Sequence, residues 1–147
     1  MNSGVSNAAE GRAVLRHHRQ AMEAVESGVL KSIAEHGYSD ASAFAIRLAL
    51  EEALTNAFKH GNKDNPQKSV VLEWRVAPDH VDLMVQDEGE GFDPQAVPDP
   101  TQEENIDIPA GRGLILMRAY MSQIDFDPPG NRVRMKYRRP HQPSRGR

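Results

Sequence analysis

Asp87 opens the motif D-x-G-x-G, directly after a stretch that alternates like a β-strand. A carboxylate can accept a hydrogen bond from an exocyclic amine, and the glycines at 89 and 91 let the backbone approach a flat ligand. The same residues are typical of an ordinary turn. On its own, this motif therefore predicts either a turn or a site that recognises an amine-bearing ring.

A second glycine motif, Gly111-Arg112-Gly113-Leu114, stands where a helix is predicted to begin. Glycines at a helix N-terminus expose backbone N–H groups, and the helix dipole favours an anion such as phosphate there. Arg112 adds a cation beside this terminus. A single G-x-G is nevertheless a weak indication of phosphate binding.

Glu52 and Asn56 lie four residues apart in a segment with a helical pattern, so both side chains project from one helix face. Such pairs are also common on solvated helices. Chance rarely supplies the whole order: E-x-x-x-N on a helix, a strand ending in D-x-G-x-G, an acidic loop, and G-x-G-L at a helix start. Together these motifs predict a nucleotide-binding site.

The elements that would position the motifs follow from the spacing of apolar residues. Spacings of three and four predict helices over 12–36 and 40–60, which Gly37 and Gly61 would end. No strand is expected before residue 12. A third helix is expected at 112–122, and strands are expected at 69–76, 80–86, 123–127 and 132–138.

These elements predict an α+β protein, a two-layer α/β sandwich with an antiparallel or mixed sheet and helices on one face. A length of 147 residues fits one domain. We expect a flexible N-terminus at 1–11, the domain at 12–138 and a disordered basic tail at 139–147. In the last strand Val133, Met135 and Tyr137 would face the core, and the alternating cations would face outward.

Composition excludes several kinds of site. The chain has no cysteine, so it has no disulfide, no thiol nucleophile and no cysteine-bound zinc. The adjacent His17 and His18 would point apart on a helix and read as solvated side chains. The chain has no apolar run of about 20 residues and no export signal at its start, so we expect a cytoplasmic protein without membrane association.

Charge is distributed unevenly along the chain. Residues 77–111 contain ten acids and no lysine or arginine, whereas no acid follows Asp127. The basic end could in principle be a nucleic-acid arm. Tyr137 is the sole aromatic residue among these cations, so no base-stacking platform is visible and nucleic-acid binding is not expected.

The motifs EEALTNAFKHGN, DEGEGFDP and GRGLILMR resemble the three sequence boxes of GHKL ATPases, and more closely those of the anti-sigma-factor serine/threonine kinases. The resemblance covers roughly residues 12–138 and implies the histidine-kinase-like (Bergerat) fold with ATP and Mg²⁺ as cofactors. Glu52 would be the general base or the carboxylate that positions water. Asn56 would be the sole protein ligand of Mg²⁺, and Asp87 would recognise adenine.

The resemblance also implies a pocket shaped by glycines and an ATP lid over residues 93–110. Lys59 and His60, just beyond Asn56, could contact the nucleotide or could simply stabilise the helix dipole as C-terminal cations. Arg134 is expected at the position near the adenine where many GHKL domains carry a threonine. The further candidate pocket residues are Gly89, Gly91, Phe92, Gly111, Arg112, Gly113 and Leu114.

By resemblance, the protein would phosphorylate a serine or threonine of an antagonist (anti-anti-sigma) protein and would sequester a sigma factor. A second copy of the chain is a further candidate partner. The alternatives are a non-catalytic module whose partner binding depends on ATP, an ATPase domain related to sensor histidine kinases with His17 or His18 as acceptor, and a fragment of a gyrase-like or chaperone ATPase.

Overall fold

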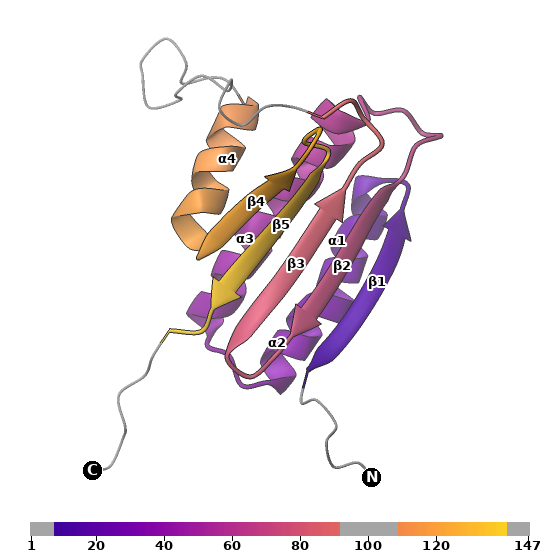
Figure 1. The fold of residues 1–147 in the computed structure, drawn as a ribbon. Helices are drawn as coiled ribbons and strands as arrows, with labels where there is room; N and C mark the ends of the chain where they lie inside the picture. Colours follow the sequence, from indigo (N-terminus) through magenta and orange to yellow (C-terminus); the bar gives the residue numbers. More distant parts are fainter. Residues whose placement is uncertain (1–7, 92–108, 141–147) are drawn as a thin grey trace, which may run out of the picture.

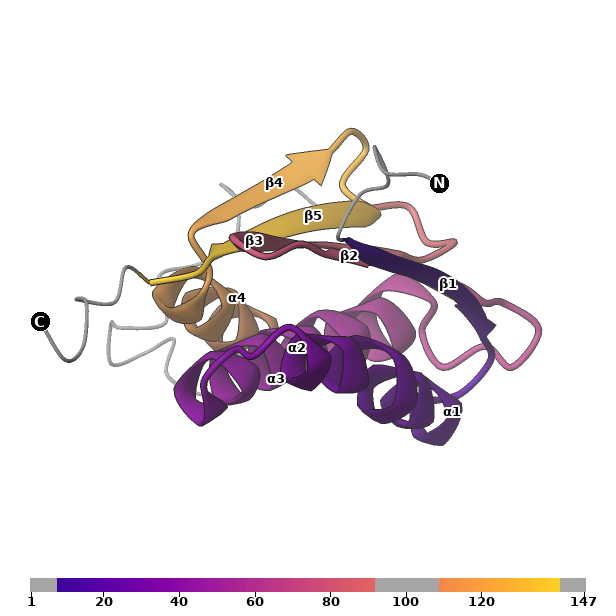
Figure 2. The ribbon, with the colours of Figure 1, turned by 90° about the horizontal axis from the view of Figure 1, so that it is seen from below.

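The computed structural model describes residues 8–91 and 109–140. A five-stranded sheet in the order β1-β2-β3-β5-β4 is antiparallel throughout. All the described helices pack on one face of this sheet (Figures 1 and 2). The predicted α+β class, with two layers and helices on one face, is therefore confirmed, and the sheet is antiparallel rather than mixed.

Eleven elements make up the described chain. The first half contains β1 (Ala9–Leu15), α1 (His18–Ala24), the π-helical turn η1 (Val25–Leu30), α2 (Lys31–Glu35), α3 (Asp40–Thr55) and the π-helical turn η2 (Asn56–Gly61). The second half contains β2 (Val70–Val76), β3 (His80–Gln86), α4 (Pro109–Tyr120), β4 (Gln123–Asp127) and β5 (Arg132–Arg138). None of the helices in the described ranges combines the length and apolarity that a membrane crossing requires.

The strand β1 corrects the prediction that a helix begins at residue 12 and that no strand precedes it. β1 pairs with β2 from Ala9 opposite Val76 to Leu15 opposite Val70. The first helix begins only at His18, and the Nδ1 atom of His17 caps it by accepting from the Gln20 N–H at 3.3 Å. Alanine and glycine have low β propensity, so the strand depends on pairing with a distant segment.

The core lies between the sheet and the helices. Ile46, Leu50 and Ala53 of α3 and Ala57 of η2 are buried. In β5 the predicted alternation of Val133, Met135 and Tyr137 with outward cations is confirmed. Ser39 caps α3 by accepting from the N–H of Ser42 at 3.1 Å. These contacts fix α3, which carries Glu52, against the centre of the sheet.

Trp74 in β2 is only partly buried, and two glycines make room for it. A Cβ on Gly11 of β1 or on Gly28 of η1 would overlap the indole ring. The side chain therefore fills the space between the β1 edge of the sheet and the first helix. This packing is one reason why the N-terminal strand can lie against β2.

We expect Gly28→Ala to destabilise the protein despite the higher helix propensity of alanine. Overpacking against the indole costs about 1–3 kcal/mol, whereas removing a helical glycine gains about 0.5–1 kcal/mol, so the net loss should be up to about 2.5 kcal/mol. Urea denaturation measures it. In a Trp74→Phe background the overlapping ring is gone, and the same substitution should be neutral or stabilising. Equal losses in both backgrounds would contradict this account.

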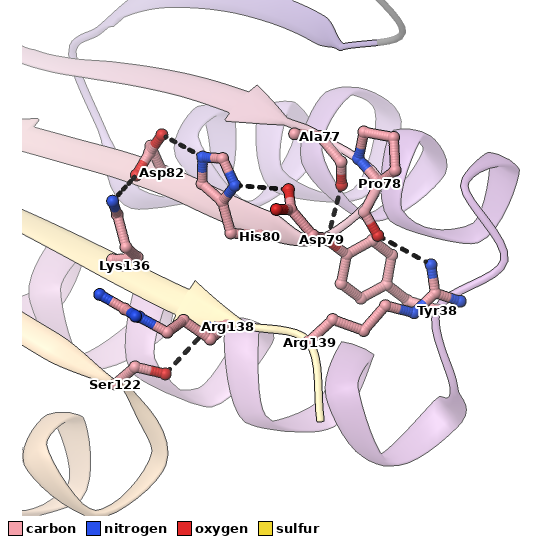
Figure 3. A network of polar contacts seen from close by, with 10 residues as sticks. All are labelled: Tyr38, Ala77, Pro78, Asp79, His80, Asp82, Ser122, Lys136, Arg138 and Arg139. Atoms are coloured by element: carbon pink, nitrogen blue, oxygen red, sulfur yellow. Dashed lines mark hydrogen bonds and ion pairs between the residues drawn. The ribbon is translucent and has the colours of Figure 1, made fainter. Parts of the chain in front are cut away.

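Arg139, which we predicted to belong to the disordered tail, lies beside Tyr38 and Pro78 (Figure 3). Its Nη1 atom donates to the carbonyl oxygens of His36 and Pro78, each at 3.1 Å. Its guanidinium lies 4.3 Å from the ring centre of Tyr38, whose hydroxyl donates to the Ala77 carbonyl at 2.6 Å. Arg139 thus ties the end of β5 to the corner between α2 and α3. Residues 141–147 lie outside the described ranges.

The cations of β5 lie on the sheet face opposite the helices, where several are paired with acids. Arg132 and Arg134 both contact Asp127, at 2.8 Å each. Lys136 lies 3.9 Å from Asp82 (Figure 3). Hydrogen bonds and charge from Arg134 lower the pKa of Asp127. Much of the basic charge of the C-terminal strand is therefore balanced within the sheet.

Candidate nucleotide-binding site

A cavity of about 190 Å³ lies where η2, the end of β3 and the β4–β5 hairpin meet α4. The tip of that hairpin and the end of β3 lie at the same end of the molecule (Figure 1). Polar groups in its lining are Asn56, His60, Asp87 and Asn131, and its apolar walls include Val85, Met117, Phe126 and Val133. A larger hollow of about 680 Å³ lies on the opposite face of the sheet, away from the three motifs.

The E-x-x-x-N motif of α3 and η2 and the G-x-G-L motif of α4 meet directly. Glu52 on α3 and Asn56 at the start of η2 are half-buried, and Gly113 of α4 packs over them. A Cβ on Gly113 would lie 2.9 Å from Oε1 of Glu52 and 3.3 Å from Nδ2 of Asn56. Any larger residue would press on both side chains. The glycine therefore brings backbone of α4 up to the carboxylate and the carboxamide.

The D-x-G-x-G motif reaches the same cavity through Asp87. Its Oδ1 atom accepts from the Gly89 N–H at 2.7 Å, and a Cβ on Gly61 would overlap its carboxylate. Partial burial raises the pKa of Asp87, while the Gly89 N–H and the charge of Lys68 act in the opposite direction. Asp87 is thus a half-buried acceptor whose burial is only partly offset by these two groups.

The raised pKa of Asp87 predicts two pH effects of opposite sign. The folded state binds this proton more tightly than the unfolded state, so the contribution of Asp87 to stability is present at low pH and is lost as pH rises through the folded pKa. Recognition of an amine requires the ionised form, so nucleotide affinity should fall as the pH is lowered through the same pKa.

Comparison with Asp87→Asn isolates both pH effects from other titrations. Urea denaturation and ATP-binding calorimetry across acidic to neutral pH should show wild-type stability gaining on the variant towards low pH, while the wild-type advantage in affinity shrinks. Parallel pH profiles for the two proteins in both measurements would show that Asp87 does not titrate in this way.

Other candidate residues are placed less directly in the cavity. His60 lines it, whereas the exposed Lys59 is not among its lining residues. Leu114 is buried in the hydrophobic core instead of lining the cavity. Phe92 and residues 93–108 of the predicted lid lie outside the described residues.

The third helix begins earlier than predicted, at Pro109 instead of residue 112. Proline suits the first helical position because its missing N–H is not needed there. Residues 109 and 110 are therefore helical rather than part of a lid. Gly111 and Arg112 lie in the first turn of α4 instead of at its very start, and the Arg112 side chain lies outside the described part of the structure.

The structure also changes the assignment near the predicted adenine position. Arg134 faces away from the helices and pairs with Asp127, while Val133 and Asn131 line the cavity. Successive strand residues point to opposite faces, so alternation in β5 already carried this signal for Val133. For Asn131, in the preceding turn, no spacing in the sequence indicated a role.

Comparison with known proteins shows the family of this domain. The sequence pattern of the histidine kinase-like ATPase domain matches residues 12–137. A protein named serine-protein kinase RsbW from Oceanobacillus iheyensis is 30% identical over 97 residues, which cover 62% of this chain and 61% of the relative. Proteins of the same name from Staphylococcus epidermidis and Staphylococcus aureus are 32% identical over 85 residues and 29% identical over 97 residues, covering 53% and 60% of this chain and 54% and 61% of those relatives.

The chain thus spans less than two thirds of the length of these curated relatives. The resemblance predicted from the three motifs is confirmed. The domain pattern extends from the middle of β1 almost to the end of β5, and so includes Glu52, Asn56, Asp87 and Gly113. This protein belongs to the family of histidine kinase-like ATPase domains.

Proposed function

We propose that this protein binds Mg·ATP and transfers the γ-phosphate to a serine or threonine of an antagonist protein, and that it sequesters a sigma factor. The observation that supports the proposal most is the close contact of Gly113 with Glu52 and Asn56. This contact brings a carboxylate, a carboxamide and the backbone of a glycine-rich helix turn together. They lie beside the cavity that Asp87 also lines. Relatives named serine-protein kinase favour this activity over other ATPase chemistries.

The residues present fit such a ligand. The cavity volume of about 190 Å³ is below the ~300–1,000 Å³ of pockets that enclose whole drug-sized ligands. The described walls therefore suit the adenine ring alone. The walls are apolar at Val85, Met117 and Val133, which suits a flat ring, and Asp87 supplies an acceptor at the edge. Adenine offers an amine where guanine offers a carbonyl oxygen, so Asp87 should favour ATP over GTP.

Each polar group has a distinct proposed role. The Asn56 carboxamide oxygen would hold Mg²⁺, which typically takes one or two protein ligands together with phosphate oxygens and water. When bound, the metal neutralises charge on the transferred phosphoryl group. Glu52 would orient the attacking hydroxyl and accept its proton. Backbone N–H groups at the start of α4 would face the phosphates.

The decisive test is incubation of the purified protein with γ-labelled ATP and candidate antagonist proteins from its own genome. We expect label on a serine or threonine of one antagonist, and no label when Glu52 is replaced. ATP-dependent binding of an antagonist without label transfer would instead establish the non-catalytic module. Label on His17 or His18 of the protein itself would establish a histidine kinase relationship.

A further inference from the structure

Asn62 is one of two polar residues that are buried in the described part of the chain, with 2% of its surface exposed. It directly follows η2, and its carboxamide joins two other segments. Its Nδ2 atom donates to the Ser69 carbonyl at 2.9 Å, and its Oδ1 atom accepts from the Glu88 N–H at 2.7 Å. One side chain thus links the end of the Asn56 helix, the start of β2 and the residue after Asp87.

The backbone of Asp87 is held from the opposite side as well. Its N–H donates to the carbonyl oxygen of Asn131 at 2.9 Å, and its own carbonyl accepts from Nδ2 of Asn131 at 3.1 Å. The Asp87–Glu88 peptide segment therefore lies between two asparagines from distant parts of the chain. Asn131 lines the cavity and could touch a ligand, whereas Asn62 is not among the lining residues.

Packing around this segment leaves little room for adjustment. A Cβ on Gly89 would overlap the carbonyl oxygen of Gly61, and a Cβ on Gly61 would overlap the Asp87 carboxylate. Glu88 is fastened too, because its Oε2 atom accepts from the Ser69 N–H at 2.6 Å and from the Ser69 hydroxyl at 3.1 Å. The backbone that carries Asp87 is thus held by long-range hydrogen bonds, while the Gly89 N–H orients its carboxylate locally.

We propose that Asn62 is a positioning residue that holds the Asp87 carboxylate where it can distinguish adenine from guanine. This inference rests on the proposed function, in which Asp87 accepts from the adenine amine. Loss of the Asn62 carboxamide would leave the part-buried Glu88 N–H and Ser69 carbonyl without this partner, and the segment would shift to find new ones. A shift of the acceptor weakens the contact with adenine and relaxes the rejection of guanine.

The test measures dissociation constants of Mg·ATP and Mg·GTP for wild type, Asn62→Ala and Asn65→Ala. We expect wild type to prefer ATP by about 5–150-fold, the value of one buried unpaired acceptor, and Asn62→Ala to bring the two constants within about threefold of each other. Asn65→Ala removes an exposed carboxamide three residues away and should keep the wild-type preference.

The ratio of the Mg·GTP to the Mg·ATP dissociation constant separates a positioning role of Asn62 from a merely structural one. Partial unfolding weakens both nucleotides by the same factor, so it leaves the ratio unchanged. If Asn62→Ala does not fold, Asn62→Ser takes its place, because a hydroxyl is too short to reach both partners, and the same loss of preference is expected. In an Asp87→Ala background, the Asn62 substitution should leave the ratio unaltered.

Two outcomes are distinct. Wild type without any preference for ATP would overturn the role of Asp87 in the proposed function. A clear wild-type preference that survives replacement of Asn62, or an equal further change of the ratio in the Asp87→Ala background, would overturn the inference about Asn62 and leave the proposed function standing.

Discussion

Replacing Asn56 with alanine should abolish Mg²⁺-dependent ATP binding. Asn56 is the carboxamide that lies against Gly113 of α4, and its Nδ2 atom is 3.3 Å from where a Cβ on that glycine would stand. Without an oxygen ligand at this point, the metal loses its only proposed protein anchor, and the triphosphate charge is left beside Glu52. Changes to groups that merely support metal ligands cost about 10–100-fold in affinity, so loss of the ligand itself should cost at least about 100-fold.

Calorimetric titration with ATP, in Mg²⁺ and in EDTA, measures this effect. Thr55→Ala is the matched control, since it removes a half-buried polar side chain one position earlier on the helix, about 100° away from the face of Asn56. We expect the control to bind Mg·ATP as wild type does. Equal affinity of wild type and Asn56→Ala would refute the assignment of the metal site.

Local periodicity predicted most of the sheet correctly, because strands with one buried face alternate strictly. β3 and β5 lie where alternation placed them, and Arg134 lies on the outward face that alternation gave it. The resemblance to other GHKL domains had suggested Arg134 at the adenine. Strand alternation predicted the direction of Arg134 correctly, because one step along a strand reverses the direction of the side chain.

Features that depend on distant pairing were not predictable in this way. β1 has alanine and glycine where strands usually carry branched residues, and its position follows from the free edge of β2 and the space around Trp74. Asn62 bonds to groups 7 and 26 residues away. No residue spacing in the sequence predicts such long-range hydrogen bonds. The motif order predicted one site for Glu52 and Gly113, and a Cβ on Gly113 would indeed lie 2.9 Å from Oε1 of Glu52.

Replacing Glu52 with alanine should preserve nucleotide binding and remove phosphoryl transfer. A general base acts as the proton leaves the attacking hydroxyl, so its loss raises the barrier without weakening the ground-state contacts that we propose for Asn56, Asp87 and α4. Losses of about 10²–10⁴-fold in transfer rate are typical for such a group. Glu52→Gln keeps the shape of the side chain beneath Gly113 and should show the same loss, which separates chemistry from packing.

The chain supplies a close control in Glu51. It is the same residue type one position earlier, but its carboxylate pairs with Arg47 at 3.3 Å on a different face of α3. Single-turnover transfer from labelled ATP to the antagonist should therefore be unchanged in Glu51→Ala and nearly absent in both Glu52 variants, with all three binding Mg·ATP like wild type. Wild-type transfer by Glu52→Gln would make this carboxylate a structural neighbour of Gly113, and the base would have to come from the antagonist or from water.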